Sequence, residues 1–322
     1  MIKITFPDST VKEFNKGTTS LEIANSISVS LVKKCIIAKV NGELYDLNRP
    51  IEEDASFELV TGFIPELQNV LNHSCAHLLA TAVRELYPNA KFGVGPAIEE
   101  GFYYDMDLAD VKLTEEDLTK IEKKMRALAE AALVVERSVV SKQEALEVFK
   151  GDEYKTELIN ELPEDEVITI YKQGNFVDLC RGPHVANTKW LKTFKLLNVS
   201  GAYWRGDSDR NQLQRVYGTC FFDEASLKEY LVILEERKKR DHRRLGKELE
   251  LFMLSEFGPG FPFWLPNGMV LRRTLEDFWY KIHTEHGYQL VQTPIMLNKE
   301  LWEISGHWFN YKENMYTSQI DE

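Results

Sequence analysis

Residues 73–77 read His-Ser-Cys-Ala-His, and residues 180–184 read Cys-Arg-Gly-Pro-His. Each of these two segments begins and ends with a side chain that can bind a metal ion or transfer a proton. The four side chains are those of His73, His77, Cys180 and His184. They could ligate zinc, or they could activate a water molecule with a thiol beside it. The spacing alone leaves both kinds of site open, and the chain around the two segments predicts where each lies in the fold.

The first segment lies in a predicted helix over residues 71–87, which contain no proline or glycine. Apolar residues recur at helical spacing on one face of that helix: Leu71, Cys75, Leu78, Leu79, Ala82, Val83 and Leu86. His73 and His77 are four residues apart and lie together on the opposite face. The pattern argues against two core histidines and leaves a solvated face or a face that lines a cleft.

The second segment begins where a predicted strand ends. Residues 176–180, Phe-Val-Asp-Leu-Cys, are typical of a short strand, and the Arg-Gly-Pro sequence that follows must leave it. Cys180 and His184 therefore lie at a strand end and in the turn after it, where functional residues are common.

The composition is that of a globular protein of two or three domains. The 322 residues contain no apolar run long enough to span a membrane, and the four cysteines are too scattered for a disulfide framework. The N-terminus has no signal-peptide pattern. We therefore expect a protein of the reducing cytoplasm.

The net charge of −12 argues against a nucleic-acid partner, but the charge is unevenly distributed. Residues 99–117 contain eight acidic residues and one lysine, whereas residues 237–247 contain seven Lys or Arg residues and one aspartate. A local basic stripe can bind phosphate groups even on an acidic protein, although a solvated helix face explains the same pattern. The candidate RNA-binding residues are Arg237, Lys238, Lys239, Arg240, Arg243 and Arg244.

The order of the predicted elements indicates an α+β multidomain protein. Short alternating strands, one helix and an Asn41-Gly42 hairpin signal predict a small β-grasp unit at the N-terminus. An α/β unit with both His/Cys segments follows, then one long basic helix as a rigid connector, then the beginning of a third unit. The boundaries are 1–62, 63–224, 225–247 and 248–322.

These features together resemble the threonyl-tRNA synthetases of the bacterial type, and the resemblance covers the whole chain. Residues 1–62 resemble the TGS domain of that family, and the two His/Cys segments match its editing domain. Residues 240–247 and 259–268 look like the entry to the class II catalytic domain, which is built on an antiparallel sheet. A helix is expected over residues 270–286. Residues 287–296 are expected to form a strand that fits class II motif 1, which shapes the dimer interface in such enzymes.

Nothing in the sequence resembles class II motif 2, motif 3, the zinc ligands of the synthetic site or an anticodon-binding domain. We therefore expect an N-terminal fragment that cannot activate threonine with ATP. The resemblance implies ATP, Mg²⁺ and Zn²⁺ only for the full-length enzyme, with ligands beyond residue 322. It also implies a homodimer of the full-length enzyme, and no membrane partner is expected.

The resemblance implies that this chain retains hydrolytic editing of mischarged Ser-tRNA(Thr), with tRNA(Thr) as its partner and with no metal or cofactor. Serine is threonine without a methyl group, and a pocket that fits threonine rejects serine by only about 1–3 kcal/mol. A second site that hydrolyses the serine ester and excludes the extra methyl group supplies the missing discrimination.

His73 is the residue expected to position or deprotonate the water, since histidine titrates near neutral pH. Cys180 could act as a nucleophile or hold the water, and His77 could orient the others. By resemblance, Lys155 also lines the site, Asp178 holds the ammonium group of the substrate and Tyr104 contacts the substrate.

Two other functions fit the same residues. A related editing domain of the alanyl type uses a similar set of His and Cys residues to hold zinc, which would make this chain a zinc-binding trans-editing hydrolase. The chain could also be a non-catalytic fragment that binds tRNA through the β-grasp unit and the basic stripe.

Overall fold

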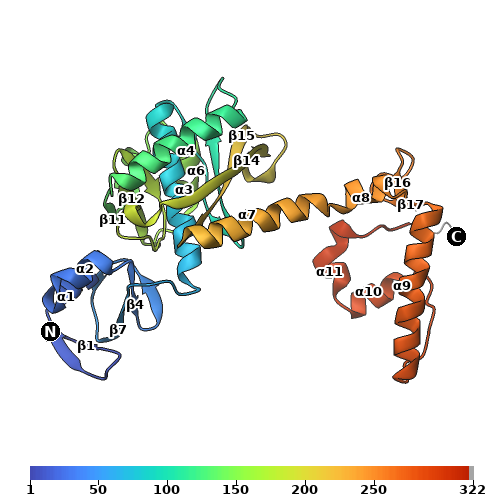
Figure 1. The fold of residues 1–322 in the computed structure, drawn as a ribbon, viewed down its shortest axis with the longest axis horizontal. Helices are drawn as coiled ribbons and strands as arrows, with labels where there is room; N and C mark the ends of the chain where they lie inside the picture. The colour runs from blue at the N-terminus through green and yellow to red at the C-terminus, as the bar shows by residue number, and fades with distance from the viewer. Residues whose placement is uncertain (319–322) are drawn as a thin grey trace. The chain divides into compact units, whose positions relative to one another are not determined.

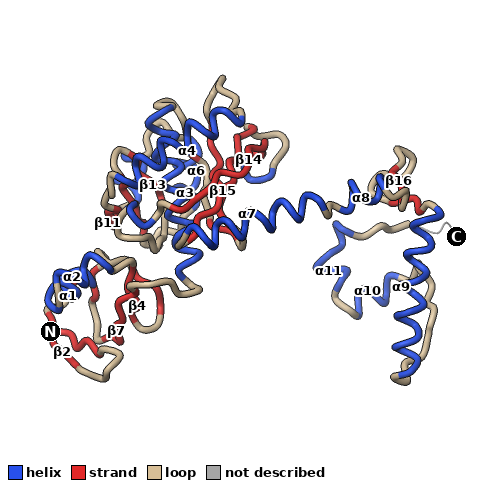
Figure 2. The backbone as a smooth tube through the Cα atoms, viewed as in Figure 1, coloured by secondary structure: helices blue, strands red, loops and turns tan. Residues whose placement is uncertain are grey.

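The computed structural model describes residues 1–318 of the chain. The chain forms two compact units, Met1–Glu235 and Glu236–Glu322. Figure 1 shows the path of the chain, and Figure 2 distinguishes its helices and strands. Within the part that is described, no helix combines the length and the apolar composition needed to cross a membrane.

The N-terminal part of the first unit is a mixed sheet with two short helices. Its elements are β1 (Ile2–Thr5), β2 (Val11–Phe14), β3 (Thr18–Thr19), α1 (Ser20–Ile27), α2 (Val29–Lys34), β4 (Ile37–Val40), β5 (Glu43–Tyr45), β6 (Pro50–Ile51) and β7 (Ala55–Val60). The strand order is β2-β1-β7-β4-β5, with β1 and β7 parallel. Asn41 and Gly42 join β4 to β5 with φ of 52° and 84°, as the predicted hairpin requires.

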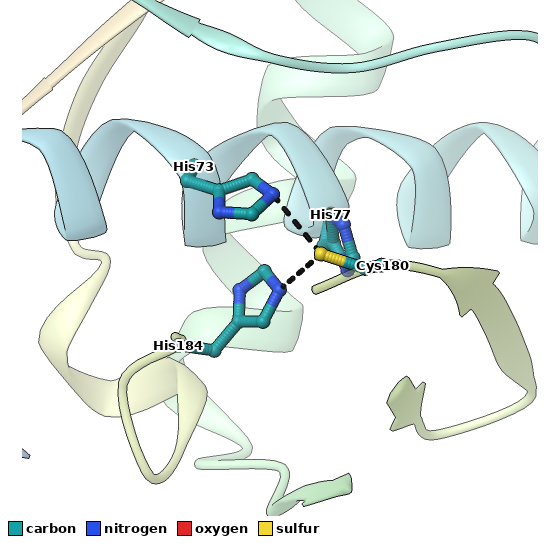
Figure 3. A group of neighbouring side chains, drawn as sticks. All are labelled: His73, His77, Cys180 and His184. Carbon is teal, nitrogen blue, oxygen red and sulfur yellow. Dashed lines mark hydrogen bonds between the residues drawn. The ribbon is translucent and has the colours of Figure 1, made fainter. Parts of the chain in front are cut away.

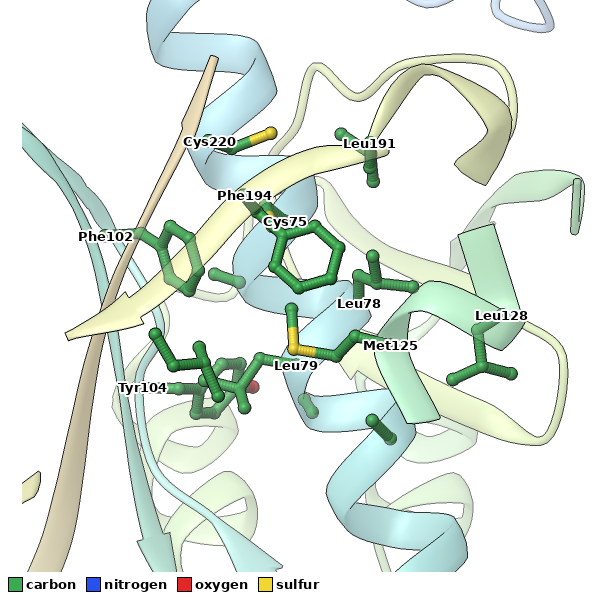
Figure 4. Packing of buried hydrophobic residues seen from close by; sticks show 14 of the residues in the cluster. Cys75, Leu78, Leu79, Phe102, Tyr104, Met125, Leu128, Leu191, Phe194 and Cys220 are labelled. Atoms are coloured by element: carbon green, nitrogen blue, oxygen red, sulfur yellow. The ribbon is translucent and has the colours of Figure 1, made fainter. Parts of the chain in front are cut away.

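The remainder of the first unit contains a larger sheet covered by two helices. Its elements are α3 (Leu67–Leu86), β8 (Lys91–Phe92), β9 (Ala97–Ile98), β10 (Gly101–Asp107), α4 (Glu115–Glu130), η1 (Thr188–Trp190), β14 (Thr193–Tyr203), η2 (Trp204–Gly206) and β15 (Gln212–Phe221). The strand order is β14-β15-β10-β8, and β9 pairs with β10. Helix α3 packs against β10 and β15, and α4 packs against α3 and β14. Figure 4 shows side chains from both helices and the sheet meeting in one apolar core.

A second, three-stranded sheet completes the first unit. It is built from β11 (Val135–Val140), α5 (Lys142–Val148), α6 (Glu153–Glu161), β12 (Ile168–Gln173) and β13 (Phe176–Leu179). The strand order is β11-β12-β13, all antiparallel. Strand β13 ends at Leu179, so Cys180 follows the strand, as predicted. Alternation along β13 buries Phe176 and Asp178 on the same side.

Helix α3 begins at Leu67, four residues earlier than predicted, and both of its faces are covered. Helix α3 also contacts β12 and β13, where His77 meets Asp178 and Thr81 meets Gln173, whereas His73 stays partly exposed. His77 is only 3% exposed. The expectation that the pair avoids the interior is therefore wrong for His77, because a second sheet that helical periodicity cannot reveal covers this face.

The single helix predicted over residues 225–247 is also wrong. Helix α7 (Glu224–Lys239) ends within the basic stripe, and two residues separate it from α8 (His242–Glu248). Asp241 between them has an extended backbone, and its carboxylate accepts hydrogen bonds from the backbone N–H groups of Arg243 and Arg244. The aspartate is thus an N-cap that starts a new helix inside the stripe.

In its described residues, the second unit contains the end of α7, α8, a strand pair and further helices. After α8 come β16 (Phe252–Leu254), β17 (Pro262–Trp264), α9 (Pro266–Glu285), α10 (Lys299–Ile304), α11 (His307–Tyr311) and η3 (Lys312–Asn314). The helix predicted over residues 270–286 is α9, which begins earlier, with proline in its first turn. The strand predicted over residues 287–296 is absent from the described structure. A strand needs a hydrogen-bonded partner, and β16 and β17 pair with each other.

Candidate functional site

The two His/Cys segments meet where α3 lies beside the end of β13 (Figure 3). His73 and His77 come from successive turns of α3, Cys180 follows β13, and His184 lies in the loop after it. One ligand atom from each of these four residues lies within 4.8 Å of all the others. The Sγ of Cys180 is 3.2 Å from Nε2 of His73 and 3.2 Å from Nε2 of His184. We call these four residues the His/Cys cluster.

The members of the His/Cys cluster differ in their access to solvent. His77 and His184 are 3% and 2% exposed, whereas His73 and Cys180 are partly exposed. A water molecule or a substrate that enters from solvent therefore meets His73 and Cys180 first.

A buried group of polar side chains adjoins the cluster. The Nζ of Lys155 forms an ion pair with Oδ1 of Asp178, and the Tyr104 hydroxyl donates to Oδ2 of the same carboxylate. The Nε2 of His77 lies 3.2 Å from Oδ2 and connects this group to the cluster. Asp178, Lys155 and Tyr104 are 2%, 3% and 0% exposed. All three residues that the family resemblance added to the site therefore lie together beside His77.

Two residues that were not singled out in the sequence hold His184. The Oγ of Ser74 is 3.1 Å from Nδ1 of His184 and accepts the backbone N–H of Val185 at 3.1 Å. Asp46, which follows β5, accepts the backbone N–H of His184 at 2.8 Å. Ser74 lies inside the first His/Cys segment, so its hydroxyl was a visible candidate. Asp46 is 138 residues from His184, and no local pattern marks it.

Burial keeps the cluster uncharged. It lowers the pKa of His73, His77 and His184 below the ordinary 6.5, that of His77 to about 3. Burial, reinforced by the charge of Asp178, raises the pKa of the Cys180 thiol to about 12. At neutral pH the cluster thus consists of three neutral imidazoles and a thiol.

The carboxyl group of Asp178, beside the cluster, has a lowered pKa instead. Burial by itself raises the pKa of Asp178, but the charges of Lys155 and His77 and the hydrogen bonds of Lys155 and Tyr104 together hold it below the ordinary 3.8. Since His77 is neutral near pH 7, its contact with Asp178 is a hydrogen bond, and Lys155 supplies the positive charge.

The His/Cys cluster has the residue types of a zinc site. Cys sulfur and His nitrogen are common zinc ligands, and a tetrahedral site separates them by about 3.5 Å. The two Sγ–Nε2 distances of 3.2 Å are close to that value. The hydroxyl of Ser74 on Nδ1 of His184 would orient a metal-bound imidazole. The Nε2 of His77 faces Asp178, so His77 would offer its other ring nitrogen to a metal ion while the carboxylate orients the ring.

The candidate RNA-binding residues lie at the end of α7, in the turn after it and in α8. They belong to the second unit, whereas the His/Cys cluster belongs to the first. Several are paired with acids: Lys239 and Arg240 with Glu236, Arg243 with Asp241, and Arg244 with Glu248.

Two family models match parts of this chain. Residues 2–61 match the family model described as TGS domain, and residues 168–217 match that described as threonyl and alanyl tRNA synthetase second additional domain. The chain is 54% identical to a threonine–tRNA ligase of Enterococcus faecalis over 316 residues, 98% of this chain and 49% of that protein. The resemblance to threonyl-tRNA synthetases is confirmed. A threonine–tRNA ligase of Clostridioides difficile is 51% identical over 324 residues, 100% of this chain and 50% of that protein. The chain thus spans about half the length of the curated threonine–tRNA ligases it matches.

Proposed function

We propose that this chain hydrolyses the ester bond of mischarged Ser-tRNA(Thr). One observation carries the proposal: the His/Cys cluster lies beside the buried pair of Lys155 and Asp178, and part of this site falls in the segment that matches the threonyl and alanyl second additional domain. A neutral, partly exposed imidazole can activate water, and a buried carboxylate can hold an ammonium group, which supports hydrolysis of an aminoacyl ester here.

His73 is the proposed base, because it is neutral near pH 7 and is reached from solvent. Its imidazole takes a proton from water while the water oxygen attacks the ester carbonyl carbon. As the bond from that carbon to the ribose oxygen breaks, the proton passes to the ribose oxygen, which releases serine and tRNA. Cys180 holds the water as a hydrogen-bonding thiol, since its raised pKa makes a thiolate nucleophile scarce. His77 and His184 orient these two residues.

Asp178 is the proposed contact for the substrate ammonium group. A carboxylate offers about four acceptor positions, and Lys155, Tyr104 and His77 occupy three on Asp178. One position remains for the ammonium group, and Tyr104 lies beside it. Selection of serine over threonine at this site would supply the discrimination that a threonine-binding pocket lacks.

Deacylation of Ser-tRNA(Thr) and Thr-tRNA(Thr), measured side by side, tests the proposal. Wild-type protein should hydrolyse the serine ester faster, and His73→Ala should slow that reaction by about 10²–10⁴-fold. His286→Ala, at an exposed position of the second unit, is the matched control and should leave the rate unchanged. If wild-type protein and His73→Ala hydrolyse Ser-tRNA(Thr) equally slowly, editing is excluded and a tRNA-binding fragment remains; equal fast rates would exclude only His73 as the base.

A zinc-dependent hydrolase of the alanyl type is the second candidate, because the four ligand atoms lie within 4.8 Å of one another. A bound zinc would polarise the ester carbonyl and lower the pKa of a bound water. Elemental analysis of the purified chain distinguishes the two: one zinc per chain, lost in Cys180→Ala, supports the zinc enzyme.

For the longer protein, we propose the activity of its relatives: attachment of threonine to tRNA(Thr) with ATP and Mg²⁺, a synthetic site that binds Zn²⁺, and a cytoplasmic homodimer. Residues 1–62 would then be a β-grasp TGS domain, and residues 248–322 would begin the class II domain. The basic stripe, residues 237–247, would contact tRNA. This chain alone should show no threonine-dependent exchange between ATP and pyrophosphate.

A further inference from the structure

We propose that Asp46 is a positioning residue of the hydrolytic site, supplied by the N-terminal sheet region rather than by either His/Cys segment. The inference rests on the proposed function. Asp46 lies between β5 and β6, and it is only 6% exposed. Its carboxylate contacts residues of the 180–184 segment, which carries half of the His/Cys cluster.

Both oxygens of Asp46 are used at this contact. Oδ1 accepts the backbone N–H of His184 at 2.8 Å, and Oδ2 accepts the hydroxyl of Tyr171 at 2.9 Å. Gly182 fits tightly against the same two groups. Its φ is +73°, and a Cβ there would lie 2.0 Å from the Tyr171 hydroxyl and 3.4 Å from Oδ2 of Asp46. Asp46 therefore holds the turn between Cys180 and His184 from its outer side.

The contact fixes the imidazole of His184 through three groups. Asp46 holds its backbone, Ser74 contacts Nδ1, and Nε2 is left to face the Sγ of Cys180 at 3.2 Å. The ring of Tyr171 also packs against the ring of His184, with centroids 4.5 Å apart. Without Asp46, the buried backbone N–H of His184 would have no acceptor, and the turn could move relative to α3.

Other contacts hold the N-terminal region in place, so the position of Asp46 does not depend on its own bonds. Ile36, Ile37 and Val60 belong to the same apolar cluster as the core residues of α3. The Nζ of Lys189 donates to the backbone oxygen of Lys33 at 2.9 Å. The TGS-type region thus holds Asp46 against the 180–184 segment.

Three variants of the 322-residue chain separate positioning from general stability. Asp46→Ala removes both hydrogen bonds, whereas Asp46→Asn keeps an oxygen for the His184 backbone. Asn48→Ala is the matched control, because Asn48 bonds the backbone oxygen of Val135 at 3.4 Å in the same interface but does not contact the site. Asp46→Ala should lower the kcat of Ser-tRNA(Thr) deacylation by about 10- to 100-fold with little change in KM, because the residue touches no substrate. Asp46→Asn and Asn48→Ala should remain near wild-type.

A second readout does not require activity. Cys35, Cys75 and Cys220 are buried, so iodoacetamide should label Cys180 first, and peptide mass spectrometry follows its rate. Asp46→Ala should raise this rate several-fold, and Asn48→Ala should not. If wild-type protein is inactive while Asp46→Ala still raises the labelling rate, the proposed function fails and the positioning role stands.

If wild-type protein is active and Asp46→Ala matches Asn48→Ala in both measurements, the positioning role is refuted. Should Asp46→Ala unfold, as circular dichroism would reveal, Tyr171→Phe decides. It removes only the partner of Oδ2, and it should lower kcat and raise Cys180 labelling to a smaller extent. If Tyr171→Phe had the kcat and the Cys180 labelling rate of wild-type protein, the inference would be overturned.

Discussion

Replacing Lys155 by methionine tests whether the buried ion pair with Asp178 organises the site. Lys155 and Asp178 are both nearly fully buried, at 3% and 2% exposure. Removing one partner of such a pair leaves an uncompensated charge and costs about 3–5 kcal/mol of unfolding free energy. Replacing both, in Lys155→Met with Asp178→Asn, should cost less than the sum of the single changes, because no charge is left unpaired.

The matched control is Lys91→Met, the same substitution in an exposed ion pair. The Nζ of Lys91 lies 2.9 Å from Glu153, and the two side chains are 39% and 55% exposed. Solvent screens this pair, so its loss should cost about 0–1 kcal/mol. Urea unfolding measures the change in the unfolding free energy of the whole chain. Native-state hydrogen exchange of peptides from β13 and α6 measures the change within the first unit alone.

The loss in Lys155→Met should also depend on pH. In wild-type protein the pKa of Asp178 is held below 3.8, so the stabilisation is present above the unfolded pKa and is lost as the pH falls. In the variant, burial without the lysine charge raises the pKa of Asp178. The variant therefore takes up a proton, and the difference between the two proteins shrinks as the solution becomes acidic. The reasoning would be refuted if Lys155→Met lost no more unfolding free energy than Lys91→Met, if that loss did not change with pH, and if it added to the loss in Asp178→Asn.

Three further predictions concern the reaction and its partner. Because burial lowers the pKa of His73 below 6.5, the kcat of Ser-tRNA(Thr) hydrolysis should be level from about pH 8 down to 6.5 and fall only in more acid solution; a decline centred above 6.5 would contradict His73 as the base. Cys180→Ser should keep at least about one tenth of the rate, since a hydroxyl also hydrogen-bonds water, and mass spectrometry should find no acyl-enzyme in wild-type protein. Charge reversal of Lys238 and Lys239 to glutamate should weaken tRNA binding. It should also reduce the slope of log K against log salt by about 0.9 for each phosphate group that the basic stripe no longer neutralises. An unchanged slope would show that the stripe is a solvated helix face.

Local patterns predicted the elements that carry the site. The spacing of apolar residues located the helix of His73 and His77, and the short run before Cys180 located its strand, because both depend on neighbours in the sequence. The Asn41-Gly42 hairpin followed from the same kind of signal. These elements were sufficient to suggest one site for the two His/Cys segments, although neither pattern shows a contact between them.

Contacts between distant segments were not predictable in this way. The burial of His77 depends on a sheet that covers the polar face of α3, and the support of His184 comes from Asp46, 138 residues away. The strand expected over residues 287–296 failed for the same reason, since a strand exists only where another strand pairs with it. The break between α7 and α8, by contrast, could have been predicted from the sequence, because aspartate is a common N-cap residue. The basic residues on both sides of Asp241 favoured the interpretation as one continuous helix instead.

The protonation of the His/Cys cluster bears on whether it works with water or with a metal ion. Neutral imidazoles suit both, since a general base and a zinc ligand each need an unprotonated nitrogen. Cys180 separates the two: zinc binds the thiolate, and burial raises the pKa of this thiol to about 12. Zinc would therefore have to displace the thiol proton, whereas His77 could keep its contact with Asp178 and offer its other ring nitrogen. Water activated by His73 does not require loss of the thiol proton, so the zinc content of the purified chain and its dependence on Cys180 are the measurements that separate the two mechanisms.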